Sequence, residues 1–192
     1  MTVEVVDKRE SILMATLGLI AEHGFHGSPM SEIAERAKIG VGTIYRYFPG
    51  KQDLVNALYI ETKKRVASYI LRGFEDSLSV RDGITHLLKQ TIPYFAERPA
   101  ELFFAEQYEH SPLIRAKTRS EGIAEIEPIL RLLERGVQEG ELKDLPCELL
   151  GALISGPVFS VARMFVDEPA RLTETFVDAG VGAIWDSIGQ SS

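Results

Sequence analysis

The sequence predicts an all-α protein, and three observations support this fold class. Apolar residues recur at intervals of three and four, which is the period of an amphipathic helix. No run of alternating β-branched residues is flanked by the Asn-Gly or Asp-Gly turns that join neighbouring strands. Glycine and proline residues divide the chain into segments of helical length. Together these features predict helices and no sheet.

The first predicted helix covers about residues 8–23. Leu13, Leu17 and Ile20 are spaced i, i+4 and i+7, so they share one face. Gly24 is expected to end the helix, because glycine readily adopts the left-handed conformation that closes many helices.

Two short helices are expected next. Ser28 is expected to cap the first, and Pro29 suits its first turn because the N–H that proline lacks would be unpaired there. After a three-residue turn, the second covers about residues 41–48, and Pro49-Gly50 breaks it. Two short helices joined in this way, with the small Ala34 at their crossing, describe a helix-turn-helix.

The rest of the chain is expected to form a helical bundle. Helices are predicted over residues 51–72, 80–97, 100–110, 112–139, 146–166 and 169–188. Pro128 falls inside the fourth of these segments, so a kink or break is expected there. Residues 189–192 are expected to form a loose tail. Residues 1–50 are therefore predicted as the N-terminal helix-turn-helix domain and residues 51–192 as the C-terminal domain.

The N-terminal residues resemble the signature of TetR/AcrR transcription regulators. Residues 28–37 read Ser-Pro-Met-Ser-Glu-Ile-Ala-Glu-Arg-Ala, and residues 39–51 read Ile-Gly-Val-Gly-Thr-Ile-Tyr-Arg-Tyr-Phe-Pro-Gly-Lys. The resemblance implies a DNA-binding helix-turn-helix domain followed by a ligand-binding and dimerisation domain. It implies a repressor that binds a palindromic operator as a homodimer and is released by a small-molecule effector, with activation as the alternative to repression.

The resemblance also places roles on matching positions. The implied DNA-binding residues are Ser28, Ser31, Val41, Gly42, Thr43, Tyr45, Arg46, Tyr47 and Lys51. A glycine lets the backbone approach the duplex, hydroxyl groups donate to phosphate oxygens, and a lysine displaces counterions. Arg46 is the best candidate for a bidentate contact to guanine. For Arg46 the alternative is a solvated side chain, and for the two tyrosines it is core packing.

Two positions depart from the family pattern. Lys38 stands where the family usually has glycine, and a left-handed lysine costs on the order of 1 kcal/mol. Gly40 replaces the usual Ser or Thr cap of the second short helix, which glycine replaces at little cost. Both departures affect the base contacts that are expected, and neither removes the resemblance to the family.

An effector site is expected in the C-terminal domain. The proposed lining residues are Phe103, Phe104, Tyr108, Phe159 and Arg163. Such sites are mostly apolar with a few polar anchors, so an apolar or aromatic effector is expected. Ordinary core packing is the alternative for each aromatic residue.

Small residues are concentrated in the last two predicted helices. They are Gly151, Ala152, Ser155, Gly156, Ser160, Ala179, Gly180, Gly182 and Ala183. Glycine weakens helices, so its frequency here suggests that two backbones approach closely. The resemblance assigns both helices to a four-helix dimer interface, with Phe176, Val181 and Trp185 as apolar anchors; close packing within one chain is the alternative.

Composition and charge fit this interpretation. The net charge is −7, but residues 1–51 contain six basic and six acidic residues, so the rest of the chain carries the whole excess of acid. A neutral N-terminal segment is compatible with DNA binding while an acidic body discourages non-specific adhesion. There is one cysteine, Cys147, and no apolar run long enough to span a membrane, so a cytoplasmic protein is expected.

Other chemistries have weaker support. Gly40-Val41-Gly42 is a fragment of a dinucleotide-binding loop without the strand that must precede it. His23 and His26 have glycines beside them and are not expected to bind metal, and Cys147 is expected to be an inert thiol. We therefore expect no catalytic residues, no metal and no cofactor. The main competing interpretation is a dimeric ligand-binding bundle that does not regulate transcription.

Overall fold

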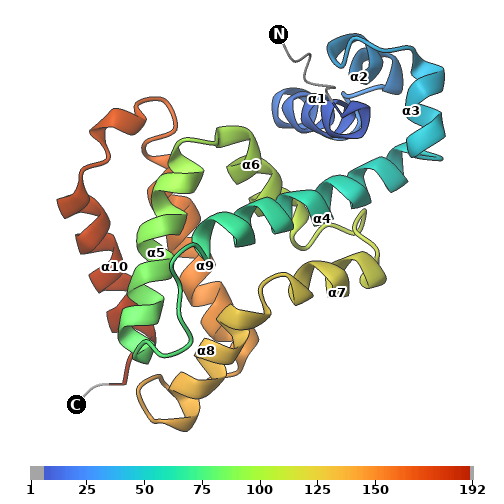
Figure 1. Ribbon diagram of the computed structural model, residues 1–192. Helices are drawn as coiled ribbons and strands as arrows, with labels where there is room; N and C mark the ends of the chain where they lie inside the picture. The colour runs from blue at the N-terminus through green and yellow to red at the C-terminus, as the bar shows by residue number, and fades with distance from the viewer. Residues whose placement is uncertain (1–6, 191–192) are drawn as a thin grey trace, which may run out of the picture. The chain divides into compact units, whose positions relative to one another are not determined.

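Figure 1 shows the computed structural model of the chain, which describes residues 7–190. Its helices are α1 (Lys8–His23), α2 (Met30–Arg36), α3 (Val41–Tyr47), α4 (Lys51–Ile70), α5 (Val80–Ala96), α6 (Pro99–Tyr108), α7 (Ala116–Ala124), α8 (Glu127–Gln138), α9 (Cys147–Arg163), the short 3-10 helix η1 (Pro169–Arg171) and α10 (Glu174–Ile188). Apart from one isolated bridge, the described residues form no β-structure. The all-α prediction is confirmed.

The boundaries of α1 agree with the sequence prediction. The carboxylate of Asp7 accepts a hydrogen bond from the N–H of Arg9 (3.0 Å), which satisfies one of the unpaired donors of the first turn. At the other end Gly24 has a φ of 70°, and its N–H donates to the carbonyl of Ile20 (2.8 Å). Gly24 therefore closes α1 with a positive φ, as expected, but its ψ of 179° lies outside the left-handed helical conformation.

Two later segments show how proline changes a helix. The expected break near Pro128 is confirmed, because α7 ends at Ala124 and α8 begins at Glu127. The predicted helix over 169–188 starts too early: Pro169 opens only the short η1. The long helix begins at Glu174, because the hydroxyl of Thr173 accepts the N–H of Phe176 (3.3 Å) and caps it.

The chain groups into two compact units, and each is described here by itself. The first contains residues up to 62 together with 103–122, and the second contains residues 63–102 together with those from 123 onward. The division at residues 50 and 51 into DNA-binding and ligand-binding domains is functional and stays a prediction. None of the helices among residues 7–190 is both long and apolar enough to cross a membrane.

In the first unit, Asn56 of α4 ties that helix to the segment after α6. Only 5% of Asn56 is exposed. Its side-chain amide donates to the carbonyl of Leu113 (2.9 Å) and accepts the N–H of Arg115 (2.9 Å). Beside it, the guanidinium of Arg115 pairs with Asp53 at 2.8 Å. Leaving a buried backbone group unpaired is costly, so Asn56 fixes the path of this segment.

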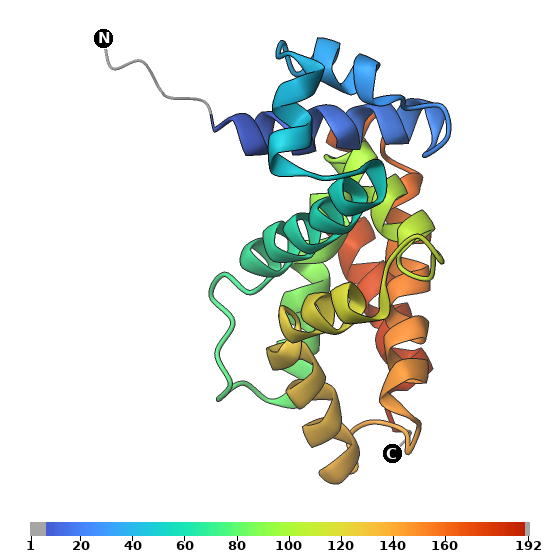
Figure 2. The ribbon, with the colours of Figure 1, turned by 90° about the vertical axis from the view of Figure 1, so that its right-hand side faces the viewer.

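The second unit is a bundle in which α5, α9 and α10 pack against one another and α8 packs against α5 and α9. Figure 2 shows α9 and α10 running side by side. Gly136 of α8 is required by this packing, because a Cβ there would lie 2.7 Å from side-chain atoms of Leu142 and Val80.

The end of the chain is more ordered than the sequence predicted. Leu142 and Gly189 form an antiparallel bridge, and the N–H of Gln190 donates to the carbonyl of Glu141 (2.8 Å). The N–H of Lys143 donates to the carbonyl of Ile188 (2.9 Å). The prediction of a loose tail is therefore wrong for residues 189 and 190, whose partners lie far away in sequence; residues 191 and 192 lie outside the described part of the chain.

Candidate nucleic-acid interface

The turn between α2 and α3 is a Schellman motif. Ala37 ends α2, and Lys38 follows in the left-handed conformation with a φ of 55°. The N–H of Lys38 donates to the carbonyl of Glu35 and the N–H of Ile39 to that of Ala34, both at 3.0 Å. Across residues 7–190, Lys38 is the only non-glycine residue with a positive φ. The position at which the family usually has glycine therefore requires the conformation that glycine adopts best.

Lys38→Gly is expected to stabilise the protein by about 1 kcal/mol, because glycine adopts a positive φ without the steric cost of a Cβ. Chemical denaturation measures the change. Lys38→Ala is the matched control: it also removes the charge but retains the Cβ, so we expect no gain. If Lys38→Gly and Lys38→Ala were equally stable, the Cβ at this positive φ would not be what destabilises the protein.

The start of α2 differs from the prediction. Pro29 occupies the cap position and provides no side-chain hydrogen bond, whereas its carbonyl accepts the N–H groups of Glu32 and Ile33 (both 3.1 Å). Ser28 is fully buried, and its hydroxyl donates to the carbonyl of Gly24 (2.7 Å). Ser28 is therefore not the cap of α2, which corrects that prediction, and because the Ser28 side chain is buried, Ser31 is the better placed of the two serines predicted to contact DNA.

Ion pairing fixes α2 against α1. The guanidinium of Arg36 forms two hydrogen bonds to the carboxylate of Glu22, at 2.8 and 2.6 Å. These bonds lower the pKa of the Glu22 carboxyl group. The arginine passes over Gly18, where a Cβ would lie 2.8 Å from its Nη1 atom. Because Gly18 has no side chain, the guanidinium of Arg36 fits against α1 and reaches Glu22.

Helix α3 has one buried face and one exposed face. Ile44 is fully buried and Phe48, which caps the helix, is 4% exposed. On the other side Val41, Tyr45 and Tyr47 are 38%, 51% and 45% exposed. Large side chains this exposed do not belong to the core of the chain, which argues against the core-packing alternative for the two tyrosines.

The remaining predicted residues around α3 are also near solvent. Gly42 and Arg46 are exposed, Thr43 is partly exposed, and Ser31 is exposed on α2. A Cβ added at Gly42 would have no neighbour within 4 Å in the described structure outside its own helix backbone. Gly40 caps α3 with extended backbone angles (φ −74°, ψ 144°), as predicted. Packing within the chain therefore does not explain why position 42 is a glycine.

Lys51 stands apart from this exposed set. Its ammonium group donates to the carbonyl of Phe25 and lies 4.3 Å from the centroid of the Phe25 ring. Burial lowers the pKa of Lys51. The side chain ties the start of α4 to the loop after α1, so its contact to phosphate stays a prediction.

Comparison with known proteins agrees with this geometry. Residues 12–58 match the family model described as bacterial regulatory proteins, tetR family. Residues 85–189, more than half of the chain, match the tetracyclin repressor-like C-terminal domain. The chain belongs to the TetR family. It is therefore a transcription regulator and not an enzyme, and the family resemblance seen in the sequence is confirmed.

Relatives of this TetR-family chain extend over most of its length. The transcriptional regulator YdeS of Bacillus subtilis is 30% identical over 155 residues, which are 78% of this chain and 75% of that protein. A TetR-family regulator from Shewanella sp. PV-4 is 25% identical, with a TM-score of 0.87 over 96% of this chain and all of that one. AibR, in complex with isovaleryl coenzyme A and operator DNA, has a TM-score of 0.74 at 18% identity, covering 93% and 98% of the two chains. At that identity the likeness concerns the fold.

The residues predicted to bind an effector are spread over both units of the TetR-family chain. In the first, the rings of Phe104 and Tyr108 stack at 4.6 Å and are almost fully buried, and Phe103 is partly buried. In the second, Phe159 packs edge-on against Phe95 (5.3 Å), and Arg163 is exposed. Their joint role stays a prediction.

Proposed function

We propose that this regulator is a repressor that binds a pseudo-palindromic operator as a homodimer and is released by a small-molecule effector. The observation that carries the proposal is the exposed face of α3. Two hydroxyl-bearing aromatic residues, an arginine and an unobstructed glycine lie on a short helix whose other face is locked into the core. Such a helix suits the major groove, where side chains reach base edges and phosphates.

The exposed surfaces of α9 and α10 support the homodimer. Both helices expose small residues, which are Ala152, Ser155, Gly156, Ser160, Ala179, Gly182 and Ala183. A Cβ at Gly151, Gly156 or Gly182 would have no neighbour within 4 Å among residues 7–190 beyond its own helix backbone. Close packing within one chain therefore does not account for these three glycines, whereas a second copy would.

The three predicted anchors of the dimer differ in how far their side chains are exposed. Val181 is 7% exposed and packs in the core of its own chain. Trp185 is partly buried, with the guanidinium of Arg81 5.2 Å from its ring. Phe176 stays the best anchor at 38% exposure, although it also packs against Phe165 (4.9 Å).

For the effector we propose an apolar or aromatic molecule. The candidate residues belong to both units. Phe103, Phe104 and Tyr108 offer aromatic surface in the first unit, and Phe159 and Arg163 offer a ring and a cation in the second. The fold shared with AibR supports the scheme, because that protein holds both isovaleryl coenzyme A and operator DNA. Effector binding would change the separation of the two α3 helices from the roughly 34–36 Å between successive major grooves.

Lys51→Ala is expected to weaken binding to every DNA sequence and to make the dependence of log K on log salt shallower by about 0.9 for one lost phosphate contact. Arg46→Ala is the matched comparison: it is expected to relax preference at one base pair instead. Titrations of a specific and a random duplex at several salt concentrations measure both effects. An unchanged salt slope, with only a loss of stability, would mean that Lys51 acts solely through Phe25.

The proposed function is tested by selecting duplexes from a random pool with the purified protein, with and without a metabolite extract. Enrichment of an inverted repeat would support both operator binding and two-fold symmetry, and loss of enrichment with the extract would support effector release. No enrichment even at low salt would contradict the proposal and favour a ligand-binding bundle without an operator.

A further inference from the structure

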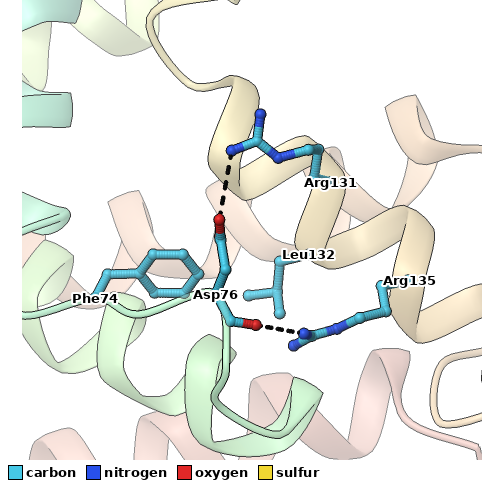
Figure 3. A pocket seen from close by; sticks show the side chains of 5 residues that line it. All are labelled: Phe74, Asp76, Arg131, Leu132 and Arg135. Carbon is cyan, nitrogen blue, oxygen red and sulfur yellow. Dashed lines mark hydrogen bonds and ion pairs between the residues drawn. The ribbon is translucent and has the colours of Figure 1, made fainter.

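A cavity of about 240 Å³ lies in the second unit, which contains none of the residues proposed to bind DNA. It is lined by Phe74, Asp76, Arg131, Leu132 and Arg135 (Figure 3). The first two residues belong to the segment that joins α4 to α5, and the other three belong to α8. The arginines are four residues apart, so they lie on the same side of α8.

Arg135 holds the shape of this cavity. Its guanidinium donates to the carbonyl of Asp76 (2.6 Å) and to the carbonyl of Leu78 (2.5 Å). Both acceptors are neutral main-chain atoms, so these bonds fix the joining segment against α8 without cancelling the positive charge of the arginine.

Arg131 is held less firmly by the cavity's one carboxylate. Its Nη2 atom lies 3.8 Å from a carboxylate oxygen of Asp76, whose side chain is 73% exposed. Its Nη1 atom pairs more closely, at 2.5 Å, with Glu127, one turn earlier on α8. An exposed ion pair at 3.8 Å contributes little, so a better placed carboxylate would displace that of Asp76.

The remaining lining is apolar. Leu132 is 3% exposed, and the Phe74 side chain lies beside it (Figure 3). A Cβ at Gly83 would lie 3.0 Å from Leu132 and 3.3 Å from the Phe74 ring, so α5 supports both side chains from behind. The volume is sufficient for an aromatic ring with a short substituent, since a cavity of about 150 Å³ accommodates benzene.

We propose that this cavity binds a small aromatic monocarboxylate, whose carboxylate pairs with Arg131 in place of Asp76 and whose ring lies against Phe74 and Leu132. A ligand carboxylate would accept from the Nη2 atom of Arg131, the atom that now faces Asp76, and an aromatic ring matches the apolar wall. The proposal does not depend on operator binding.

The test is titration of the full-length protein with benzoate, phenylacetate and 1-naphthoate, followed by calorimetry or ligand-observed NMR. Benzamide lacks the charge of these probes, and inorganic phosphate lacks their ring. At least one carboxylate is expected to bind about tenfold more tightly than either control. Absence of carboxylate binding up to about 10 mM, or equal binding of benzamide or phosphate, would overturn the proposal.

Variants locate the binding. Arg131→Gln is expected to weaken the carboxylate about tenfold, because a charge-assisted pair is lost. Asp76→Asn is expected to tighten it about two- to fivefold, because the competing carboxylate is removed. Arg171→Gln, which changes an exposed arginine paired with Glu168, is the control and is expected to have no effect. Weaker binding by Asp76→Asn, or unchanged binding by Arg131→Gln, would refute the assignment.

Discussion

Gly182→Arg is expected to convert the protein to a monomer and to lower its affinity for an inverted-repeat operator about 100- to 10,000-fold. The added side chain would have no neighbour in its own chain within 4 Å of the Cβ, as far as residues 7–190 are concerned. Arginine is also a better helix former than glycine, which is about 0.8–1.0 kcal/mol less favourable than alanine, so α10 itself is expected to gain stability. Operator affinity is expected to fall because of the lost dimer. In a dimer, binding of one subunit to its half-site holds the other subunit at a high effective concentration near the second half-site, and a monomer lacks this gain.

Light scattering coupled to size exclusion measures the mass, and titration of a labelled duplex measures the affinity. Gln138→Arg is the matched control, because it adds the same charge at an exposed position near the end of α8. Circular dichroism checks that helical content is retained in both variants. A Gly182→Arg protein of dimeric mass with unchanged affinity would exclude this face of α10 from the interface.

Gly42→Leu is expected to lower operator affinity about 10- to 100-fold while leaving stability equal or higher. Position 42 lies in the first turn of α3 with open space around its Cα, so the chain accommodates leucine, and leucine is a better helix former than glycine. In the proposed complex the helix backbone approaches the duplex at this point. A bulky side chain would hold α3 away from the base edges and so weaken the contacts that discriminate between bases. Each such contact contributes about 1–3 kcal/mol of discrimination.

Gly40→Ser is the control for that experiment, because it alters the adjacent glycine at the cap and supplies the hydroxyl that caps prefer. It is expected to retain operator binding and to gain slightly in stability. Fluorescence anisotropy and thermal unfolding on the same samples separate the two properties. If Gly42→Leu binds like the parent protein, α3 does not enter the groove at its N-terminal end.

The helix-turn-helix was predictable because its signals are local. Gly24 closes α1, Pro49-Gly50 ends α3, and each acts on the few residues beside it. The error at Ser28 arose because two local bonds compete for one hydroxyl: the side chain turns back to the carbonyl of Gly24 instead of forward to α2. The cap at Thr173 was not predicted, because Pro169 is the stronger helix-start signal in the sequence. In the structure only the short η1 begins at Pro169.

What the sequence did not predict depends on contacts between distant residues. Gly189 pairs with Leu142, and Arg135 binds carbonyls of residues 76 and 78. On α8 alone, Arg131 and Arg135 resemble an ordinary solvated face. The cavity that they line exists only because the segment joining α4 to α5 folds onto that face.

The hydrogen bonds of Asn56 also bear on how such a regulator can diverge. Asn56 recognises the carbonyl of residue 113 and the N–H of residue 115, and both are main-chain atoms that almost any amino acid provides. Side chains along this segment are therefore free to change from one descendant to the next while the path of its backbone is preserved. Sequence change along this segment could proceed without redesign of the helix that holds it.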